Sequence, residues 1–179
     1  MIIRFVGFGG QGIILSSYIM GQSAVLDGKK ALQNQSYGSE SRGGECRGDV
    51  IISDEDIYEL EPSEQDVLVA MTQPGYEKFI DSLRPGGTLL LDSDLVTESV
   101  SHPPEIKKCG INATDIAFRQ FGRSIVANMV MLGFMNAHLN LVTVKSLEKA
   151  ITNSVPPGTE ELNVKAMRQG MKLAASRAI

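Results

Sequence analysis

The sequence is poor in the residues that build metal and disulfide sites. Among 179 residues it has two cysteines, Cys46 and Cys109, and two histidines, His102 and His138. Two separated cysteines are too few for a disulfide framework or a four-thiolate iron–sulfur site, and together with two separated histidines they form no zinc pattern. No Cys-x-x-Cys motif occurs. We therefore expect this chain to bind neither a metal ion nor a cluster.

The sequence also lacks blocks of like charge and long apolar runs. Seventeen Lys and Arg residues against 21 Asp and Glu give a net charge of −4, which does not indicate a nucleic-acid-binding surface. The longest apolar candidate, 125–142, is interrupted by polar residues and is no membrane span. The first residues do not resemble a signal peptide. We expect a soluble, cytoplasmic chain in which residues 1–179 form one domain.

Strand-like and helix-like segments alternate along most of the chain. Short β-branched or apolar runs next to glycine or proline predict strands, and apolar residues at helical spacing predict helices. The predicted strands are 2–6, 30–35, 49–53, 66–71, 88–92 and 106–109, and the predicted helices are 10–26, 76–83, 124–138, 144–152 and 159–178. This order predicts the α/β class, as a Rossmann-like domain with a mainly parallel sheet, flanking helices and a helical C-terminal region.

The first predicted strand runs into a glycine-rich turn, Gly7-Phe8-Gly9-Gly10-Gln11-Gly12, which fits G-x-G-x-x-G. Between a strand and a helix, these glycines permit a tight turn and a close ligand, and the helix start offers free N–H groups to an anion. A nicotinamide dinucleotide site would need an acid about 20 residues further on, where this chain has Gln33-Asn34-Gln35. A structural turn and a coenzyme phosphate contact both remain open.

A second glycine-rich segment, 36–48, follows the second predicted strand and is expected to be a loop at the carboxyl edge of the sheet, where open α/β proteins bind ligands. Arginine there can bind carboxylate or phosphate, with glutamate holding it in place, although a solvated loop with internal Glu–Arg pairs is an equal alternative. We predict that both glycine-rich segments border one crevice, to which Arg42 and Arg47 would bring charge. The candidate contact residues are Gly7, Gly9, Gly10, Gln11, Gly12, Ser36, Tyr37, Gly38, Glu40, Arg42, Gly43 and Gly44.

Taken together at this spacing, the two segments resemble the gamma subunit of 2-oxoacid:ferredoxin oxidoreductases. The resemblance extends over essentially the whole chain and is closest to the 2-oxoglutarate type, with pyruvate, branched-chain and aryl relatives. Further matching motifs are Asp49-Val50-Ile51-Ile52-Ser53, Gln73-Pro74, Pro85-Gly86-Gly87 and Asn128-Met129-Val130-Met131-Leu132-Gly133.

This resemblance implies one part of an enzyme that oxidatively decarboxylates a 2-oxoacid with coenzyme A, giving acyl-CoA, CO2 and reduced ferredoxin. It implies that alpha and beta subunits hold thiamine diphosphate and that iron–sulfur clusters lie on other subunits, a delta subunit among the candidate partners. The gamma chain alone would then bind no cofactor and be inactive, while it contributes to the coenzyme A approach. A stand-alone nucleotide- or coenzyme-A-binding regulatory or assembly module is the alternative.

No residue is assigned a catalytic role. Nothing in the sequence places His102 or His138 beside a nucleophile, and the favoured interpretations are a surface residue for His102 and a satisfied or interface residue for His138. Cys46 would be a reactive thiolate only if neighbouring arginines lowered its pKa. Cys109 is expected to be packed.

The predicted helix around 125–140 carries apolar residues on nearly its whole circumference. A helix that is apolar all round must be covered on every side. Either it is the central core helix of the domain, or one face contacts another subunit. Both interpretations remain open, and the methionines would suit an adaptable contact surface.

Overall fold

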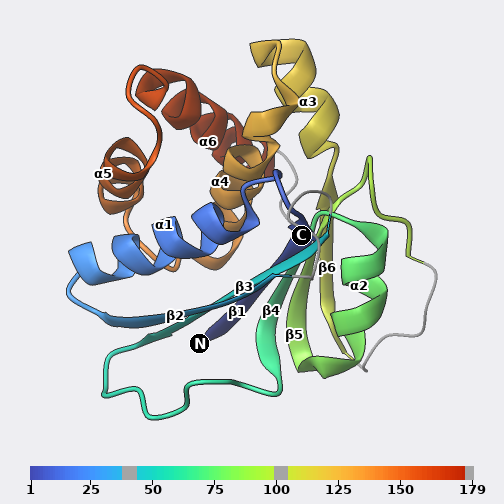
Figure 1. Cartoon of the computed structure of the whole chain (residues 1–179), viewed down its shortest axis with the longest axis vertical. Helices are drawn as coiled ribbons and strands as arrows, with labels where there is room; N and C mark the ends of the chain where they lie inside the picture. Colours follow the sequence, from blue (N-terminus) through green and yellow to red (C-terminus); the bar gives the residue numbers. More distant parts are fainter. Residues whose placement is uncertain (38–43, 99–104, 176–179) are drawn as a thin grey trace.

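The computed structural model describes residues 1–37, 44–98 and 105–175, and its centre is a six-stranded sheet in the order β2-β3-β1-β4-β5-β6 (Figure 1). The candidate residues Gly38, Glu40, Arg42 and Gly43, together with His102, lie outside the described residues. The strands are β1 (Ile2–Phe8), β2 (Lys30–Tyr37), β3 (Glu45–Ser53), β4 (Gln65–Ala70), β5 (Leu83–Asp92) and β6 (Lys107–Ile111). The helices are α1 (Ile13–Leu26), α2 (Gln73–Phe79), α3 (Ala113–Phe121), α4 (Ala127–Leu139), α5 (Val144–Ser154) and α6 (Glu160–Ala175), with 3-10 turns at Ile80–Ser82 and Ser124–Val126.

The sheet is mainly parallel, which confirms the predicted α/β class. Strands β1, β4, β5 and β6 pair in parallel, whereas β3 runs antiparallel to both of its neighbours, β2 and β1. The reversal has a simple cause. Only residues 38–44 separate β2 from β3, and a parallel crossover needs a dozen residues or more. Half of the predicted loop 36–48 is therefore strand, because β2 continues to Tyr37 and β3 begins at Glu45.

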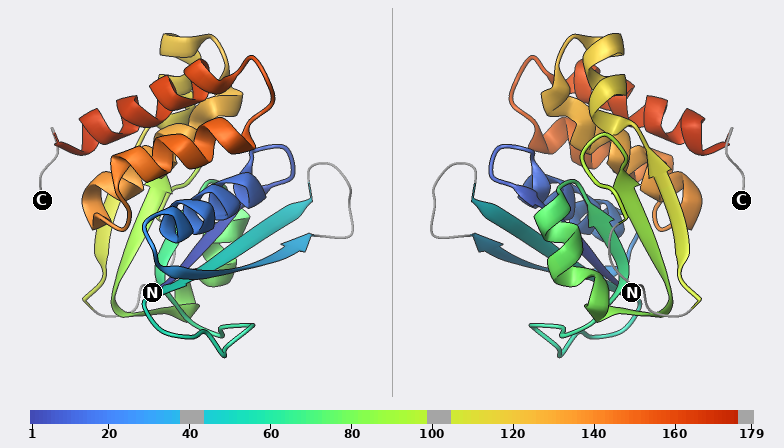
Figure 2. Two further views of the ribbon diagram at one scale, coloured as in Figure 1. Left: turned by 90° about the vertical axis from the view of Figure 1, so that its left-hand side faces the viewer. Right: turned by 90° about the vertical axis from the view of Figure 1, so that its right-hand side faces the viewer.

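Two hydrophobic clusters lie on opposite faces of the sheet. Successive strand residues point to opposite faces, so Val67 and Val69 of β4 join the larger cluster, and Leu68 and Ala70 join the smaller one. Among the described helices, α2 covers the smaller cluster, and α1 and α3–α6 cover the larger (Figure 2). The long apolar strands predicted at 66–71 and 88–92 are thus buried on both sides.

Helix α4 is the central helix of the larger cluster and not a subunit interface. All residues from Ala127 to Asn136 are buried, and Phe134 is 1% exposed. The C-terminal half of the chain supplies the cover, since α6 lies along α4 and α3 packs beside it. Within the described chain no face of this stretch is left for a partner. The interface interpretation is therefore wrong for this helix, and the core interpretation is confirmed.

Two glycines let α4 and α6 approach to backbone contact. A Cβ added at Gly133 would overlap the carbonyl oxygen of Met167, and one added at Gly170 would overlap that of Val130. These neighbours are helix backbone, which cannot move aside as the end of a side chain can. Because the two helices approach so closely, α6 buries the face of α4 that it contacts.

The burial of α4 predicts that Phe134→Asp prevents folding. The variant would place a charge among apolar groups with no partner, at a cost on the order of the roughly 5–15 kcal/mol that keeps a typical domain folded. Ile125→Asp is the matched control, because Ile125 is 56% exposed just before α4. Far-UV circular dichroism should show an unfolded Phe134→Asp and a native Ile125→Asp. A folded Phe134→Asp chain that merely dissociates from other subunits would restore the interface interpretation.

The crossing of α4 and α6 predicts that Gly133→Ala destabilises the chain by about 3 kcal/mol, because one of the two helices must shift. For a domain of this size the melting temperature should fall by roughly 6–12 °C. The control is Gly21→Ala in α1, where the nearest atom to the new Cβ is Cγ2 of Val50 at 3.3 Å, which has to give way far less than the backbone beside Gly133. Alanine also favours the helix there, so Gly21→Ala should stay within about 1 kcal/mol of wild type. Equal melting temperatures for both variants would contradict the close crossing.

Candidate functional site

The glycine-rich turn lies at the carboxyl edge of the sheet, between β1 and α1. The backbone N–H of Gly9 donates to the carbonyl of Gly44 at 2.9 Å, and that of Gln11 donates to the carbonyl of Phe8 at 3.1 Å. Gly10 and Gly12 adopt positive φ angles of 101° and 74°. Side chains rarely adopt this conformation, so both positions require glycine for the path of the chain itself.

Two glycines of the motif make room for the protein's own side chains. A Cβ at Gly7 would lie 2.6 Å from both Oε1 of Gln11 and Cδ1 of Ile13, and one at Gly12 would overlap the amide of Asn128. Gln11 ties the turn together, since its Oε1 accepts from the N–H of Phe8 at 2.7 Å and its Nε2 donates to the carbonyl of Met71 at 3.2 Å. The structural-turn interpretation therefore explains Gly7, Gly10 and Gly12 without a ligand.

The start of α1 nevertheless keeps the features of an anion site. Gly12 caps the helix without a side-chain hydrogen bond, and the first turn carries no acidic residue. Its N–H groups and positive helix end are thus not neutralised by a side chain of that turn. Pockets of about 200 and 240 Å³ flank the turn, one lined by Gly10 and Gln11 and the other by Gly12 and Arg123. Arg123 escaped sequence reasoning, because it is distant in the chain and belongs to no motif.

The β2–β3 hairpin meets the glycine turn at the same edge. Phe8 pairs with Glu45 and Gly7 with Cys46, while Ser36 and Tyr37 of β2 pair with Arg47 and Cys46 on the other side of β3. In the described residues the two glycine-rich segments are therefore neighbours, as predicted. This places Ser36, Tyr37 and Gly44 next to the turn.

The sheet separates Arg47 from the start of α1. Cys46 and Gly48 face α1, where a Cβ on Gly48 would overlap the hydroxyl of Ser17. Arg47 and Asp49 alternate to the opposite face, beneath α2, where Arg47 lies over the Phe79 ring at 5.8 Å. The prediction that Arg47 adds charge to the α1 anion site is wrong, because strand alternation points its side chain through the other face.

The α2 face holds a buried ion pair that sequence reasoning missed. Arg4 of β1 and Asp49 of β3 are 2% and 1% exposed and lie opposite each other in register. Nε and Nη2 of Arg4 donate to the two carboxylate oxygens at 2.8 and 3.0 Å. Nη1 donates to Oε1 of Gln65 at 2.9 Å, and Nη2 also donates to the carbonyl of Pro62 at 2.9 Å. Both charges are thus paired and hydrogen-bonded.

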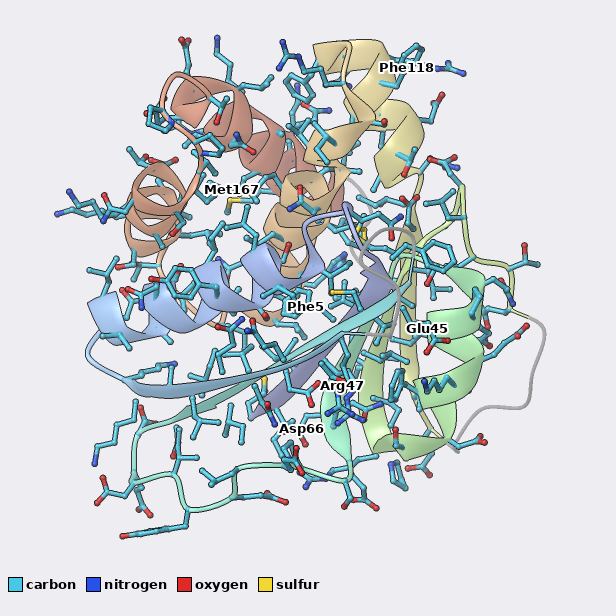
Figure 3. All side chains as sticks on the ribbon, in the orientation of Figure 1. Phe5, Glu45, Arg47, Asp66, Phe118 and Met167 are labelled. Carbon is cyan, nitrogen blue, oxygen red and sulfur yellow. The ribbon has the colours of Figure 1, made fainter. Side chains whose placement is uncertain are left out.

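A pocket of about 210 Å³ opens beside this pair, between β1, β3 and α2. Glu45 and Lys78 form an ion pair at its rim, and Arg47 lies in its wall (Figure 3). Nε of Arg47 is 3.4 Å from Oδ2 of Asp49, yet it is buried without a hydrogen-bond partner in the part of the chain that the structure describes. The pocket therefore presents an arginine whose hydrogen-bonding capacity is not used up.

Comparison with known proteins identifies the family. The family model for pyruvate ferredoxin/flavodoxin oxidoreductase matches residues 2–173. The chain belongs to this family. It is 44% identical to the 2-oxoglutarate synthase subunit KorC of Methanocaldococcus jannaschii, over 96% of this chain and 92% of that protein. It is 32% identical to the pyruvate synthase subunit PorC of Methanothermobacter marburgensis, over 93% of each.

A solved structure of the same family agrees with the fold. The gamma subunit of a keto/oxoacid ferredoxin oxidoreductase from Geobacter sulfurreducens PCA superposes with a TM-score of 0.85 at 42% identity, covering 98% of this chain and 99% of that one. The resemblance to the gamma subunit is confirmed. This chain is a gamma-type subunit of the 2-oxoacid:ferredoxin oxidoreductase family.

The cysteines of this gamma-type chain do not fit an iron–sulfur cluster. Cys46 lies on β3 and Cys109 on β6, four strands apart in the sheet, which is about 19 Å at ~4.8 Å per strand. Burial raises the pKa of both thiols. The reactive-thiolate interpretation of Cys46 is therefore not supported, since its side chain faces α1 and the Arg47 side chain faces away.

The remaining candidates are structural. Burial lowers the pKa of His138, whose ring packs edge-on against that of Phe134 with 4.4 Å between the centroids. Its buried Nε2 has no hydrogen-bond partner among the described residues, so the expectation of a satisfied histidine is wrong. In residues 1–37, 44–98 and 105–175, no three His, Cys, Asp or Glu side chains lie together as a metal ion would require. No helix formed by these residues combines the length and apolar character needed to cross a membrane.

The buried ion pair predicts that Asp49→Asn destabilises the gamma-type chain by about 3–5 kcal/mol, because Arg4 is left buried without its counter-charge. Roughly 6–20 °C should be lost from the melting temperature. Arg119→Gln is the control, because Arg119 is 76% exposed and its pair with Asp115 spans one helix turn. That variant should melt close to wild type. If the melting temperature of Asp49→Asn equalled that of the control, the ion pair would not be holding β1 against β3.

Proposed function

We propose that the chain is the gamma subunit of a 2-oxoglutarate:ferredoxin oxidoreductase, which forms an acyl-CoA, CO2 and reduced ferredoxin. The observation that carries this proposal is the identity of 44% to a 2-oxoglutarate synthase subunit over nearly the full length of both chains. The identity to a pyruvate synthase subunit over a similar length is lower, at 32%. The difference favours 2-oxoglutarate over pyruvate as the substrate of the complex.

In this proposal the reacting groups lie on partner subunits. Thiamine diphosphate, held by alpha and beta subunits, would supply the electron sink for decarboxylation. Iron–sulfur clusters on other subunits would pass electrons to ferredoxin. The separation of Cys46 and Cys109 supports a gamma chain without a cluster of its own. The chain alone would then carry out no oxidation.

The gamma chain would contribute a seat for the phosphates of coenzyme A. The support is the start of α1, where N–H groups without a side-chain cap lie between two pockets. Phosphate is the anion that such helix ends accept, and Arg123 borders one of the pockets. Arg42 would add a second positive charge from the hairpin. These residues would bind and orient the coenzyme, with no part in the chemical step.

The proposal predicts that Arg42→Ala, in the complex assembled from all co-expressed subunits, raises the coenzyme A concentration for half-maximal activity by about ten- to hundredfold. This is the effect of losing one charge-assisted contact. The readout is 2-oxoglutarate-dependent ferredoxin reduction, with subunit stoichiometry measured alongside. Arg119→Ala, which changes an exposed arginine on α3, is the control and should behave as wild type.

Two results would count against the proposal. An unaltered coenzyme A requirement in Arg42→Ala would leave the hairpin without a part in coenzyme binding. A chain that assembles with no other subunit, yet binds ADP or coenzyme A tightly by itself, would establish the stand-alone module instead.

A further inference from the structure

The pocket beneath α2 lies apart from the proposed coenzyme A seat. It is lined by the end of β1, including Gly7 of the glycine-rich turn, by Ser36 of β2, by residues 45–47 of β3, and by Gly75, Lys78 and Phe79 of α2. The start of α1 lies on the other face of β1 and β3, so the sheet itself stands between the two sites (Figure 2). A pocket of about 210 Å³ has room for one small ionic group.

Among the described residues around this pocket, cations outnumber carboxylates. Three cations surround the Phe79 ring, with Arg4, Lys78 and Arg47 at 5.0, 5.5 and 5.8 Å from its centroid. Two carboxylates oppose them, and Asp49 already has both oxygens bound by Arg4. Glu45 is paired with Lys78. Among the described residues, Arg47 is therefore the cation with the weakest counter-charge, since its Nε lies 3.4 Å from the Oδ2 of Asp49 that Arg4 already binds.

The geometry of Arg47 indicates which kind of ligand the pocket would accept. Its Nε reaches Oδ2 of Asp49 only at 3.4 Å, with no hydrogen bond to a described residue. A guanidinium presents its N–H groups as a planar fork that matches the two oxygens of a carboxylate or phosphate. Buried polar groups normally find a partner, and Arg47, which lines the pocket with 27% of its side chain exposed, has none for its Nε, so its guanidinium points to a ligand that accepts from it.

The rim can adapt to such a ligand. Lys78 and Glu45 are 56% and 39% exposed, and exposed pairs of this kind contribute little to stability. Lys78 can therefore leave Glu45 and bind an oxygen atom of the ligand with little loss of stability. Arg47 would then hold one side of the ligand and Lys78 the other.

We propose that this pocket binds one compact oxyanion, a carboxylate or a phosphate, through Arg47 with Lys78 as the second contact. The oxyanion is either a free solute or a group presented by another subunit. Binding of a free anion does not depend on the function proposed above. Only the second source rests on it, because it requires the assembled complex.

The test titrates the isolated chain with sodium acetate and with inorganic phosphate at constant ionic strength, observing the arginine Nε–Hε resonances by NMR. The Arg47 resonance should shift and saturate with both anions, while that of Arg119 should not. Arg47→Gln should weaken the binding about tenfold or more, as reported by backbone amides of α2. Lys78→Met should weaken it less, and Arg119→Gln should leave it unchanged. A shift that never saturates, or equal binding to Arg47→Gln, would overturn the proposal.

A parallel titration with coenzyme A, observed at the backbone amides of residues 9–16, reports on the α1 seat separately. If coenzyme A does not bind at the start of α1, the result of the anion titration at Arg47 still stands. If no anion binds at Arg47, the result of the coenzyme A titration still stands.

The source of the anion is distinguished in the assembled complex by labelling arginines with an arylglyoxal and mapping the sites by mass spectrometry. Protection of Arg47 in anion-free buffer indicates an oxyanion from a neighbouring subunit, whereas protection that appears only with added phosphate indicates a free solute. Both results support the pocket. Arg47 that is labelled equally in all conditions would contradict it.

Discussion

The buried pair of Arg4 and Asp49 is the interaction on which the arrangement of the carboxyl edge depends. It joins β1 to the one reversed strand of the sheet, between residues 45 positions apart in the sequence. A buried ion pair adds little net stability, but a strand slipped by one residue would leave both charges buried and unpaired. The pair therefore selects the register in which Phe8 lies opposite Glu45 and Gly7 opposite Cys46. That register brings the hairpin to the glycine turn.

The same register places the side chains of Cys46 and Arg47, which are neighbours in β3, on opposite faces of the sheet. Cys46 is turned into the hydrophobic cluster beneath α1, where burial suppresses its thiolate. Arg47 is turned toward α2, where it shares the surroundings of the ion pair. One strand thus supplies a core residue and a pocket residue from adjacent positions. The start of α1 and the pocket beneath α2 are separate sites for this reason.

The helical side of the molecule follows a different constraint, which is the backbone contact of Gly133 with α6. Because α6 can approach so closely, α4 is covered by its own chain and its methionines are core residues. Its buried asparagines are hydrogen-bonded within the chain: Asn136 exchanges two hydrogen bonds with the backbone of Val142, at 3.0 and 3.1 Å, and Nδ2 of Asn128 donates to the carbonyl of Gly12 at 3.2 Å. Open features are not confined to the carboxyl edge and the α2 face, because a described pocket of about 320 Å³ beside the C-terminal end of α1 is lined by Asp27, Lys29 and Thr143.

The sequence alone was sufficient for the fold class, for the family resemblance and for the contact between the two glycine-rich segments. These properties depend on local patterns: apolar runs such as 66–71 predict buried strands, and glycines at fixed spacing predict a turn. Local patterns predicted the β2–β3 connection less well, since the polar start of β3 at Glu45 reads as loop. Its strand character comes from pairing on both sides with β1 and β2.

Only the tertiary structure decided what covers α4, which face Arg47 occupies and where Arg4 finds its counter-charge. Periodicity shows which residues of one element share a face, but it does not show what lies opposite that face. A helix that is apolar all round has the same sequence whether α6 or another subunit buries it. Likewise, the charges of Arg4 and Asp49 were visible from the start, but their pairing became apparent only once the register of two distant strands was known.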